Sequence, residues 1–255
     1  MSKIGVNLQP YQIFDVFGFI NLKSAVYNLK SKKVSYILNI ETATKNCSVA
    51  LAKEGKTILY KEIAEEGYSH AERLHVFIEE IISEAGIGMK DLEAVAVSQG
   101  PGSYTGLRIG VSAAKGLCYA LNIPLIAIDT LQALASKVSV TDGLIVPMID
   151  ARRMEVYCAI FSASLVKKRE VLAEIITESS FEDIQEKVYF VGDCNEKCKS
   201  FLTKDNFVFL DDIKYPSANE MSALSFDKYK KSDTVDVAYF EPYYLKDFLI
   251  TTSKK

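Results

Sequence analysis

Residues 92–121 constrain the fold more than any other stretch of the chain. LEAVAVS, at 92–98, is almost continuously apolar, which predicts a strand buried on both faces. The glycine-rich stretch SQGPGSYTGLRIG follows and leads into a helical pattern, LRIGVSAAKGLCYAL, and then into a second buried strand, PLIAID. A strand–helix–strand order requires a crossover connection between parallel strands. The sequence therefore predicts an α/β fold.

The preceding residues predict an antiparallel meander and a helix. Strands are expected at Ile37–Glu41, Ser48–Lys53 and Lys56–Ile63, with a tight turn at Glu54–Gly55. A helix should begin after Ser69, which with Glu72 would form a capping box, and end at Gly86. Its apolar residues recur at helical spacing and form one stripe: Leu74, Phe77, Ile78, Ile81, Ile82 and Ala85.

The second half of the chain repeats this opening. NIETAT at 39–44 and MIDARR at 148–153 share one order: a strand, an acidic residue, a small residue and a turn. Further strands are expected around MEVYCAIF, KREVLAEII, YFVG and FVFL, and a helix from Ala218 to Tyr229 after the cap Ser217. Two copies of one unit predict a duplicated fold. We expect domains at 34–133 and 134–255, with a C-terminal segment that could return to the first, and an extension at 1–33.

Composition limits the class of protein. The chain has 255 residues, 49% of them hydrophobic, and a net charge of −3. That charge argues against a stand-alone nucleic-acid binder, which usually carries a basic face. The five cysteines are odd in number and form no C-x-x-C pair, so we expect free thiols in a reducing cytoplasm. No apolar run reaches the length of a membrane span.

Several segments together carry a family resemblance. NIETATKNCSVAL, HAERLH, SQGPGSYTGLRIGVSAAKGL, IDTLQALA and IDARRMEVY resemble the TsaB (YeaZ) family, bacterial proteins needed to make threonylcarbamoyladenosine in tRNA. The resemblance covers about residues 34–250. It implies a two-domain, duplicated fold of the actin, hexokinase and ribonuclease H kind, with mixed sheets. It also implies a scaffold subunit that forms a heterodimer with the catalytic paralogue TsaD, is joined by the ATPase TsaE, meets tRNA through the complex, and forms a homodimer when alone.

The residues themselves offer little for catalysis. His70 and His75 are the only histidines, and five helical residues place them about 140° apart, which does not suit one metal ion. Ser103 and Thr105 would need a base that only these histidines could supply. We therefore expect no metal site and no catalytic residue in this chain.

Nucleotide binding is the alternative that stays open. In actin-like folds the two strand–turn–strand loops hold phosphates, and these loops correspond here to Glu41–Thr44 and Asp150–Arg153. A residual site for ATP, ADP or another anion would comprise Glu41, Thr42, Thr44, Gly100, Gly102, Ser103, Asp150 and Arg152. Eleven of the thirteen glycines precede residue 117, so the late glycine-rich stretch that such ATPases use is missing. An actin-fold ATPase or small-molecule phosphotransferase remains the second hypothesis.

The glycine-rich stretch is interpreted mainly as the start of an interface helix. Gly106 and Gly110 lie four residues apart, and Ala113 and Ala114 follow, so one helix face is nearly bare backbone that another helix could approach. With the earlier stripe, this predicts a partner interface at Leu74, Phe77, Ile78, Ile81, Gly106, Leu107, Gly110, Val111 and Ala114. On this hypothesis Gly110→Leu should block heterodimer formation and leave the chain folded.

Overall fold

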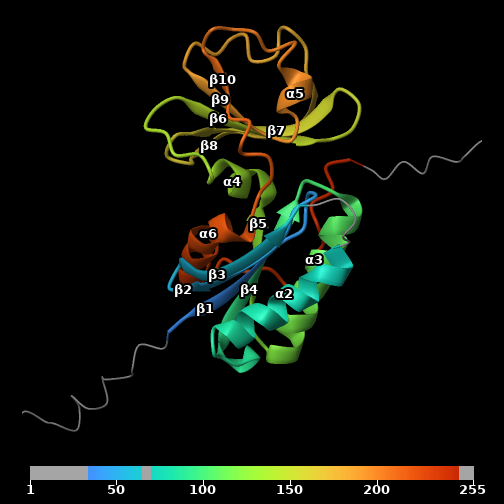
Figure 1. Ribbon diagram of the computed structural model, residues 1–255, viewed down its shortest axis with the longest axis vertical. Helices are drawn as coiled ribbons and strands as arrows, with labels where there is room; N and C mark the ends of the chain where they lie inside the picture. The colour runs from blue at the N-terminus through green and yellow to red at the C-terminus, as the bar shows by residue number, and fades with distance from the viewer. Residues whose placement is uncertain (1–33, 65–69, 247–255) are drawn as a thin grey trace, which may run out of the picture. The chain divides into compact units, whose positions relative to one another are not determined.

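The computed structural model describes residues 34–64 and 70–246 (Figure 1). The expected extension at 1–33 and the expected cap Ser69 lie outside the described residues. Within this range two five-stranded mixed sheets follow one another along the chain. No helix in the described ranges is long and apolar enough to cross a membrane.

The first sheet has the strand order β3-β2-β1-β4-β5. Its strands are β1 (Tyr36–Glu41), β2 (Cys47–Lys53), β3 (Lys56–Ile63), β4 (Leu92–Gly100) and β5 (Leu125–Asp129). The first three form the expected antiparallel meander, while β4 lies parallel to β1 and β5 parallel to β4. Glu54 and Gly55 make the turn between β2 and β3 with φ of 51° and 79°, as a tight hairpin with right-handed twist requires.

The second sheet repeats the first. Its strands are β6 (Leu144–Asp150), β7 (Glu155–Ser162), β8 (Lys167–Ile175), β9 (Val188–Gly192) and β10 (Phe207–Phe209). The order β10-β9-β6-β7-β8 is the order of the first sheet read from the other edge, and the parallel and antiparallel pairs correspond one to one. The prediction of a duplicated α/β fold with mixed sheets is confirmed.

Helices cover the two faces of the first sheet. α2 (His70–Glu84) and α3 (Tyr104–Leu121) pack on one face, while α4 (Thr130–Ala135) and α6 (Ala218–Lys230) pack on the other (Figure 1). A short helix, η1 (Met89–Asp91), leads into β4. In the second half the helix that corresponds to α3 is α5 (Asn195–Cys198), which has only four residues. The second copy of the unit is therefore much less covered than the first.

The end of the chain returns to the first sheet. α6 follows β10 but packs its buried residues, among them Ala218 and Met221, against β1, β4 and β5. Ser217 caps α6, as predicted, by accepting a hydrogen bond from the Asn219 amide.

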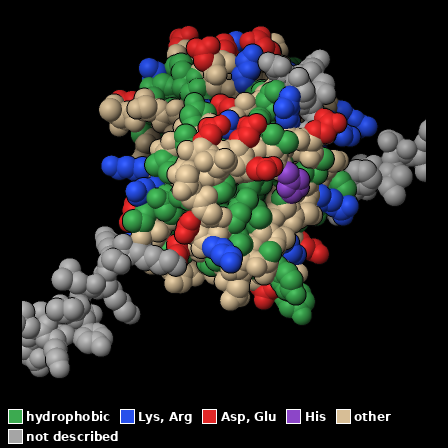
Figure 2. All heavy atoms as spheres, turned by 60° about the horizontal axis from the view of Figure 1, so that its bottom comes forward, with side chains coloured by type: hydrophobic (Ala, Val, Ile, Leu, Met, Phe, Trp, Pro, Cys, Tyr) green, Lys and Arg blue, Asp and Glu red, His purple; other side chains and the backbone are tan. Residues whose placement is uncertain are grey.

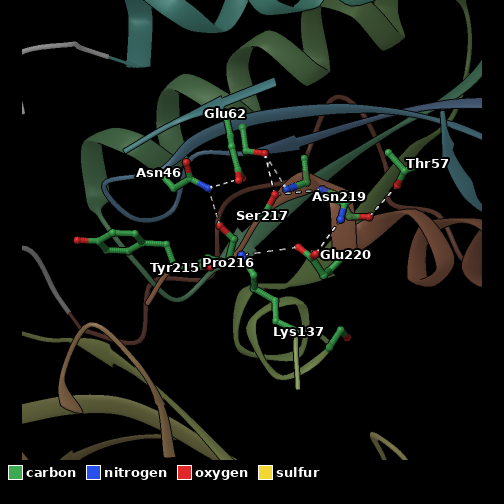
Figure 3. A network of polar contacts seen from close by, with 12 residues as sticks. Asn46, Thr57, Glu62, Lys137, Tyr215, Pro216, Ser217, Asn219 and Glu220 are labelled. Atoms are coloured by element: carbon green, nitrogen blue, oxygen red, sulfur yellow. Dashed lines mark hydrogen bonds and ion pairs between the residues drawn. The ribbon is translucent and has the colours of Figure 1, made fainter. Parts of the chain in front are cut away.

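Figure 3 shows the polar contacts that hold this crossing. Asn46 Nδ2 donates to Glu62 Oε2 and to the Pro216 carbonyl, each at 3.0 Å. Lys137 Nζ, at the end of the first crossing between the sheets, donates to the Tyr215 carbonyl at 3.2 Å on the second. The two connections between the sheets are thus tied to each other.

Candidate functional site

A groove between α2 and α3 is the main candidate for a binding surface. It encloses about 590 Å³ and is lined by Ala71, His75, Arg108, Ile109, Ser112, Ala113, Gly116 and Leu117. Most of these side chains are small or apolar, and both helices contribute. The face of the molecule shown in Figure 2 mixes hydrophobic side chains with charged ones. A lining of this kind suits a helix or helix pair of a partner better than a small polar ligand.

The groove exists because α3 presents two adjacent stripes. Leu107, Val111 and Cys118 form the stripe that faces the sheet, and all are buried. Ile109, Ala113 and Gly116 form the next stripe around the helix, which the sheet does not cover. Apart from the neighbouring residues of α3 itself, no atom of the described residues lies within 4 Å of the position that a Cβ on Gly116 would take, so this glycine widens the groove.

This arrangement corrects most of the predicted interface. Gly106, Leu107, Gly110, Val111 and Ala114 on α3, and Leu74, Ile78 and Ile81 on α2, are buried inside this chain. Only Phe77 among the predicted residues keeps partial exposure. Helical periodicity shows that a stripe is apolar but not what covers it, and the first sheet covers this one. The neighbouring stripe is the one that the sheet leaves uncovered.

Gly102, just before α3, and Gly106 and Gly110 within it serve a contact within the chain rather than a second helix. A Cβ on Gly102 would overlap the Ala43 carbonyl, one on Gly106 the Thr42 carbonyl, and one on Gly110 the Thr42 hydroxyl. Thr42 Oγ1 also donates to the Gly106 carbonyl at 2.8 Å. The turn between β1 and β2 therefore lies directly on the first turns of α3. The expectation that Gly110→Leu leaves the chain folded is wrong, because Thr42 occupies the space.

The same contact lies at the predicted anion site of the first sheet. Thr42 lies against Gly106, and Ala43 lies against Gly102 and Ser103, while the Gly100 amide donates to Thr130 Oγ1 at 3.1 Å. The Ser103 amide donates to the Ala43 carbonyl at 2.7 Å, and the Gly106 amide donates to Ser103 Oγ at 3.3 Å. The amides at a helix N-terminus bind an anion only when they are free. The chain itself uses two of the amides at this helix start, those of Ser103 and Gly106.

Glu41 lies at the end of β1 with no exposed surface. Its Oε1 accepts a hydrogen bond from the Ala43 amide at 2.6 Å. Burial raises the pKa of this carboxyl from 4.5 to about 7, because a charged carboxylate loses its hydration, and the Ala43 hydrogen bond offsets only part of that effect.

Asp150 and Arg152 occupy the corresponding turn of the second sheet. Asp150 is half exposed and forms an ion pair with Lys197 of α5. Lys197 also donates to the carbonyls of Arg153 and Glu155, each at 3.0 Å. Its ammonium group thus satisfies three oxygens of the turn. Sequence reasoning missed Lys197, because nothing in the local pattern connects α5 with residues 150–155.

The two histidines have different surroundings. His70 Nε2 lies 2.8 Å from the Thr44 carbonyl, and His75 lines the groove. Among the residues that the structure describes, no group of three or more histidine, cysteine or carboxylate side chains could hold a metal ion.

Comparison with known proteins places the chain in a family. The TsaD family, described as tRNA N6-adenosine threonylcarbamoyltransferase, matches residues 62–247. A protein of Haemophilus influenzae named tRNA threonylcarbamoyladenosine biosynthesis protein TsaB is 30% identical over 223 residues, which cover 83% of this chain and 93% of that protein. A tRNA N6-adenosine threonylcarbamoyltransferase of Bacillus subtilis is 37% identical over 115 residues, 39% of this chain and 33% of that protein.

A solved structure agrees. The structure titled YeaZ from Pseudomonas aeruginosa superimposes with a TM-score of 0.73 at 25% identity, covering 83% of this chain and all of that one. The resemblance inferred from the sequence motifs is thereby confirmed. The chain belongs to the TsaB family.

Proposed function

We propose that this chain is the scaffold subunit that supports threonylcarbamoyl transfer to the adenosine beside the anticodon of tRNA. Its family gives it a role in threonylcarbamoyladenosine biosynthesis, since its relatives are named for that pathway. In the proposed role it binds a TsaD partner, which performs the transfer, and TsaE joins the complex. Work on tRNA would place the protein in the cytoplasm.

The observation that carries the proposal is the groove between α2 and α3. The TsaD family description covers residues 62–247 of this chain and so includes both helices. A TsaD partner is therefore expected to carry a related helix pair. Two such pairs can pack face to face as a four-helix bundle, in which small residues allow close approach. A second copy of this chain could use the same groove, which accounts for the expected homodimer.

A groove-filling variant tests this proposal. Gly116→Leu places a side chain in open space, and it replaces the residue with the poorer helix propensity, so the chain should stay folded. We expect this variant to bind TsaD at least ten-fold more weakly in a titration and to support little tRNA modification in a reconstituted system. Ala223→Leu, on an exposed position of α6, adds the same side chain elsewhere and should bind normally. Wild-type affinity for Gly116→Leu would remove the groove from the interface.

Nucleotide binding remains a separate prediction. A thermal shift of the lone chain with magnesium and ATP, lost in Asp150→Ala, would favour the actin-fold ATPase or phosphotransferase. The ion pair between Asp150 and Lys197 leads us to expect no such shift.

A further inference from the structure

The turn between β6 and β7, residues 150–155, differs from its counterpart in the first sheet. The earlier turn is buried against α3, and of its residues only Lys45 is exposed. The later turn lies beside the four-residue α5 and Lys246 of the C-terminal segment, and Arg152, Arg153 and Met154 are all exposed. The duplication thus yields one turn that is filled by the chain and one that is open to solvent.

The backbone of this turn is unusual for the residues that it carries. Arg152 and Arg153 have φ of 70° and 54°, in the left-handed region. Glycine, asparagine and aspartate adopt that conformation at lower cost than arginine, whose Cβ crowds the following carbonyl. Two consecutive arginines are therefore unfavourable residues for the backbone conformation of this turn. Unfavourable backbone held at an exposed loop is a feature of functional sites.

The turn is also braced from within the chain. The Arg152 amide donates to Asp150 Oδ1 at 3.1 Å, and the Glu155 amide donates to the Arg152 carbonyl at 3.2 Å. Lys197 binds Asp150 and two carbonyls, as described above. Lys246, from the C-terminal segment, forms an ion pair with Glu155. This bracing fixes the backbone from which the two arginine side chains extend.

The electrostatics of the turn favour an anionic partner. The acidic groups beside it are compensated, because Asp150 pairs with Lys197 and Glu155 with Lys246. Asp193, whose Oδ1 accepts the Asp150 amide, has a raised pKa because it is buried. Neither arginine guanidinium forms a hydrogen bond or ion pair with another described residue. Two positive charges thus lie at an exposed turn without an ion pair to another described residue.

We propose that the Arg152–Arg153 turn binds phosphate groups of the tRNA backbone during modification. A planar guanidinium suits phosphate oxygens, which it can bind through two N–H groups at once. This inference rests on the proposed function, which brings the chain to tRNA through its complex with TsaD. It adds a direct contact to a chain whose net charge of −3 would not by itself hold RNA. The turn positions the RNA and has no part in the transfer chemistry.

The test uses a variant that keeps the backbone and removes the charge. In the double variant Arg152→Asn, Arg153→Gly, both new residues accept the left-handed conformation, so the turn should be at least as stable as in the wild type. The matched control, Lys230→Ala with Lys231→Ala at the end of α6, removes the same charge elsewhere. Binding of a tRNA transcript to the complex with TsaD is measured by fluorescence anisotropy between 50 and 200 mM salt.

We expect the Kd of the turn variant for tRNA to rise about ten-fold, and the slope of log K against log salt to fall by about two, since each lost phosphate contact contributes about one. The control should change neither quantity beyond two-fold. Wild-type affinity and slope in the turn variant would overturn the proposal. Loss of TsaD binding with intact tRNA binding would also overturn it and would assign the turn to an acidic protein surface.

Two further measurements distinguish tRNA binding at the turn from nucleotide binding and from failure of the proposed function. Binding of ATP or ADP with magnesium to the wild-type complex that is lost in the turn variant, while tRNA binding is the same in both, would show a small phosphate ligand and contradict the RNA contact. If the wild-type chain forms no complex with TsaD, the proposed function fails. The turn is then tested by the same titration on the chain alone, where equal binding by wild type and turn variant would overturn the inference.

Discussion

Replacement of Glu41 by glutamine should make the protein more stable at pH 8 and change little at pH 4. Glutamine has almost the shape of glutamic acid and can still accept the hydrogen bond from the Ala43 amide. What it lacks is the carboxylate charge, which the fully buried position disfavours. The variant therefore isolates the cost of ionising this one group.

The sign and size follow from linkage. The pKa of Glu41 is about 7 in the folded chain and near 4.5 when the carboxyl is solvated. Below pH 4.5 both states hold the proton. Between pH 4.5 and 7 the unfolded state releases it first, so the free energy of unfolding falls as pH rises. Above pH 7 both states are ionised and the loss is complete. A shift of about 2.5 units at about 1.36 kcal/mol each gives roughly 3 kcal/mol.

Urea unfolding of both proteins at intervals from pH 4 to 8 measures this. The other titrating groups are common to both proteins, so their effects cancel in the difference between the two free energies of unfolding. That difference should favour Glu41→Gln increasingly with pH and level off above pH 7, at roughly 3 kcal/mol more than at pH 4. A difference that stays constant across the range would refute the buried, proton-binding carboxyl. A difference that grows in the opposite direction would mean that the carboxylate is stabilised by a partner.

Two further predictions test the packing around it. Gly110→Leu should unfold the protein or lower its stability by about 3 kcal/mol or more, because the new side chain meets Thr42; circular dichroism melting measures this, and a wild-type melting temperature would show that the turn can move aside. The five cysteines should resist a thiol reagent at pH 8 until urea is added, because all are buried and burial raises the pKa of Cys47 and Cys118 to about 11 and of Cys158 to about 12. Rapid labelling of the native chain would contradict this burial.

The local elements could be predicted from the sequence because each has a clear period or a clear cap. The hairpin at Glu54–Gly55, the buried strand β4 and the cap Ser217 all follow from short-range rules. The six-residue α4 was not predicted, although Asp129 caps it by accepting hydrogen bonds from the Leu131 and Gln132 amides. A helix of that length carries too few residues for its period to be recognised.

The sequence indicated which two helices form the candidate surface but not which of their residues line it. α2 and α3 do form the candidate surface, yet the sequence pattern assigned the sheet-facing stripe to the partner. A glycine in a helix looks the same in the sequence whether it leaves room for a partner's helix or for a turn of its own chain. Thr42 occupies the space beside Gly106 and Gly110, whereas no other part of the described chain occupies the space beside Gly116. Only the three-dimensional position of residues 42 and 43 separates these cases.

The β1–β2 turn and the β6–β7 turn show how the two copies of a duplicated fold can come to have different roles. In the first sheet the Ala43 carbonyl accepts a hydrogen bond from the Ser103 amide at the start of α3, and Glu41 is fully buried. This contact holds the turn against the start of α3, one of the two helices that line the groove. In the second sheet the short α5 leaves the turn exposed, and Lys197 donates a hydrogen bond to the Arg153 carbonyl of the turn. In the proposed scaffold role, the first copy supplies the surface for the partner and the second copy supplies the surface for the substrate of the complex.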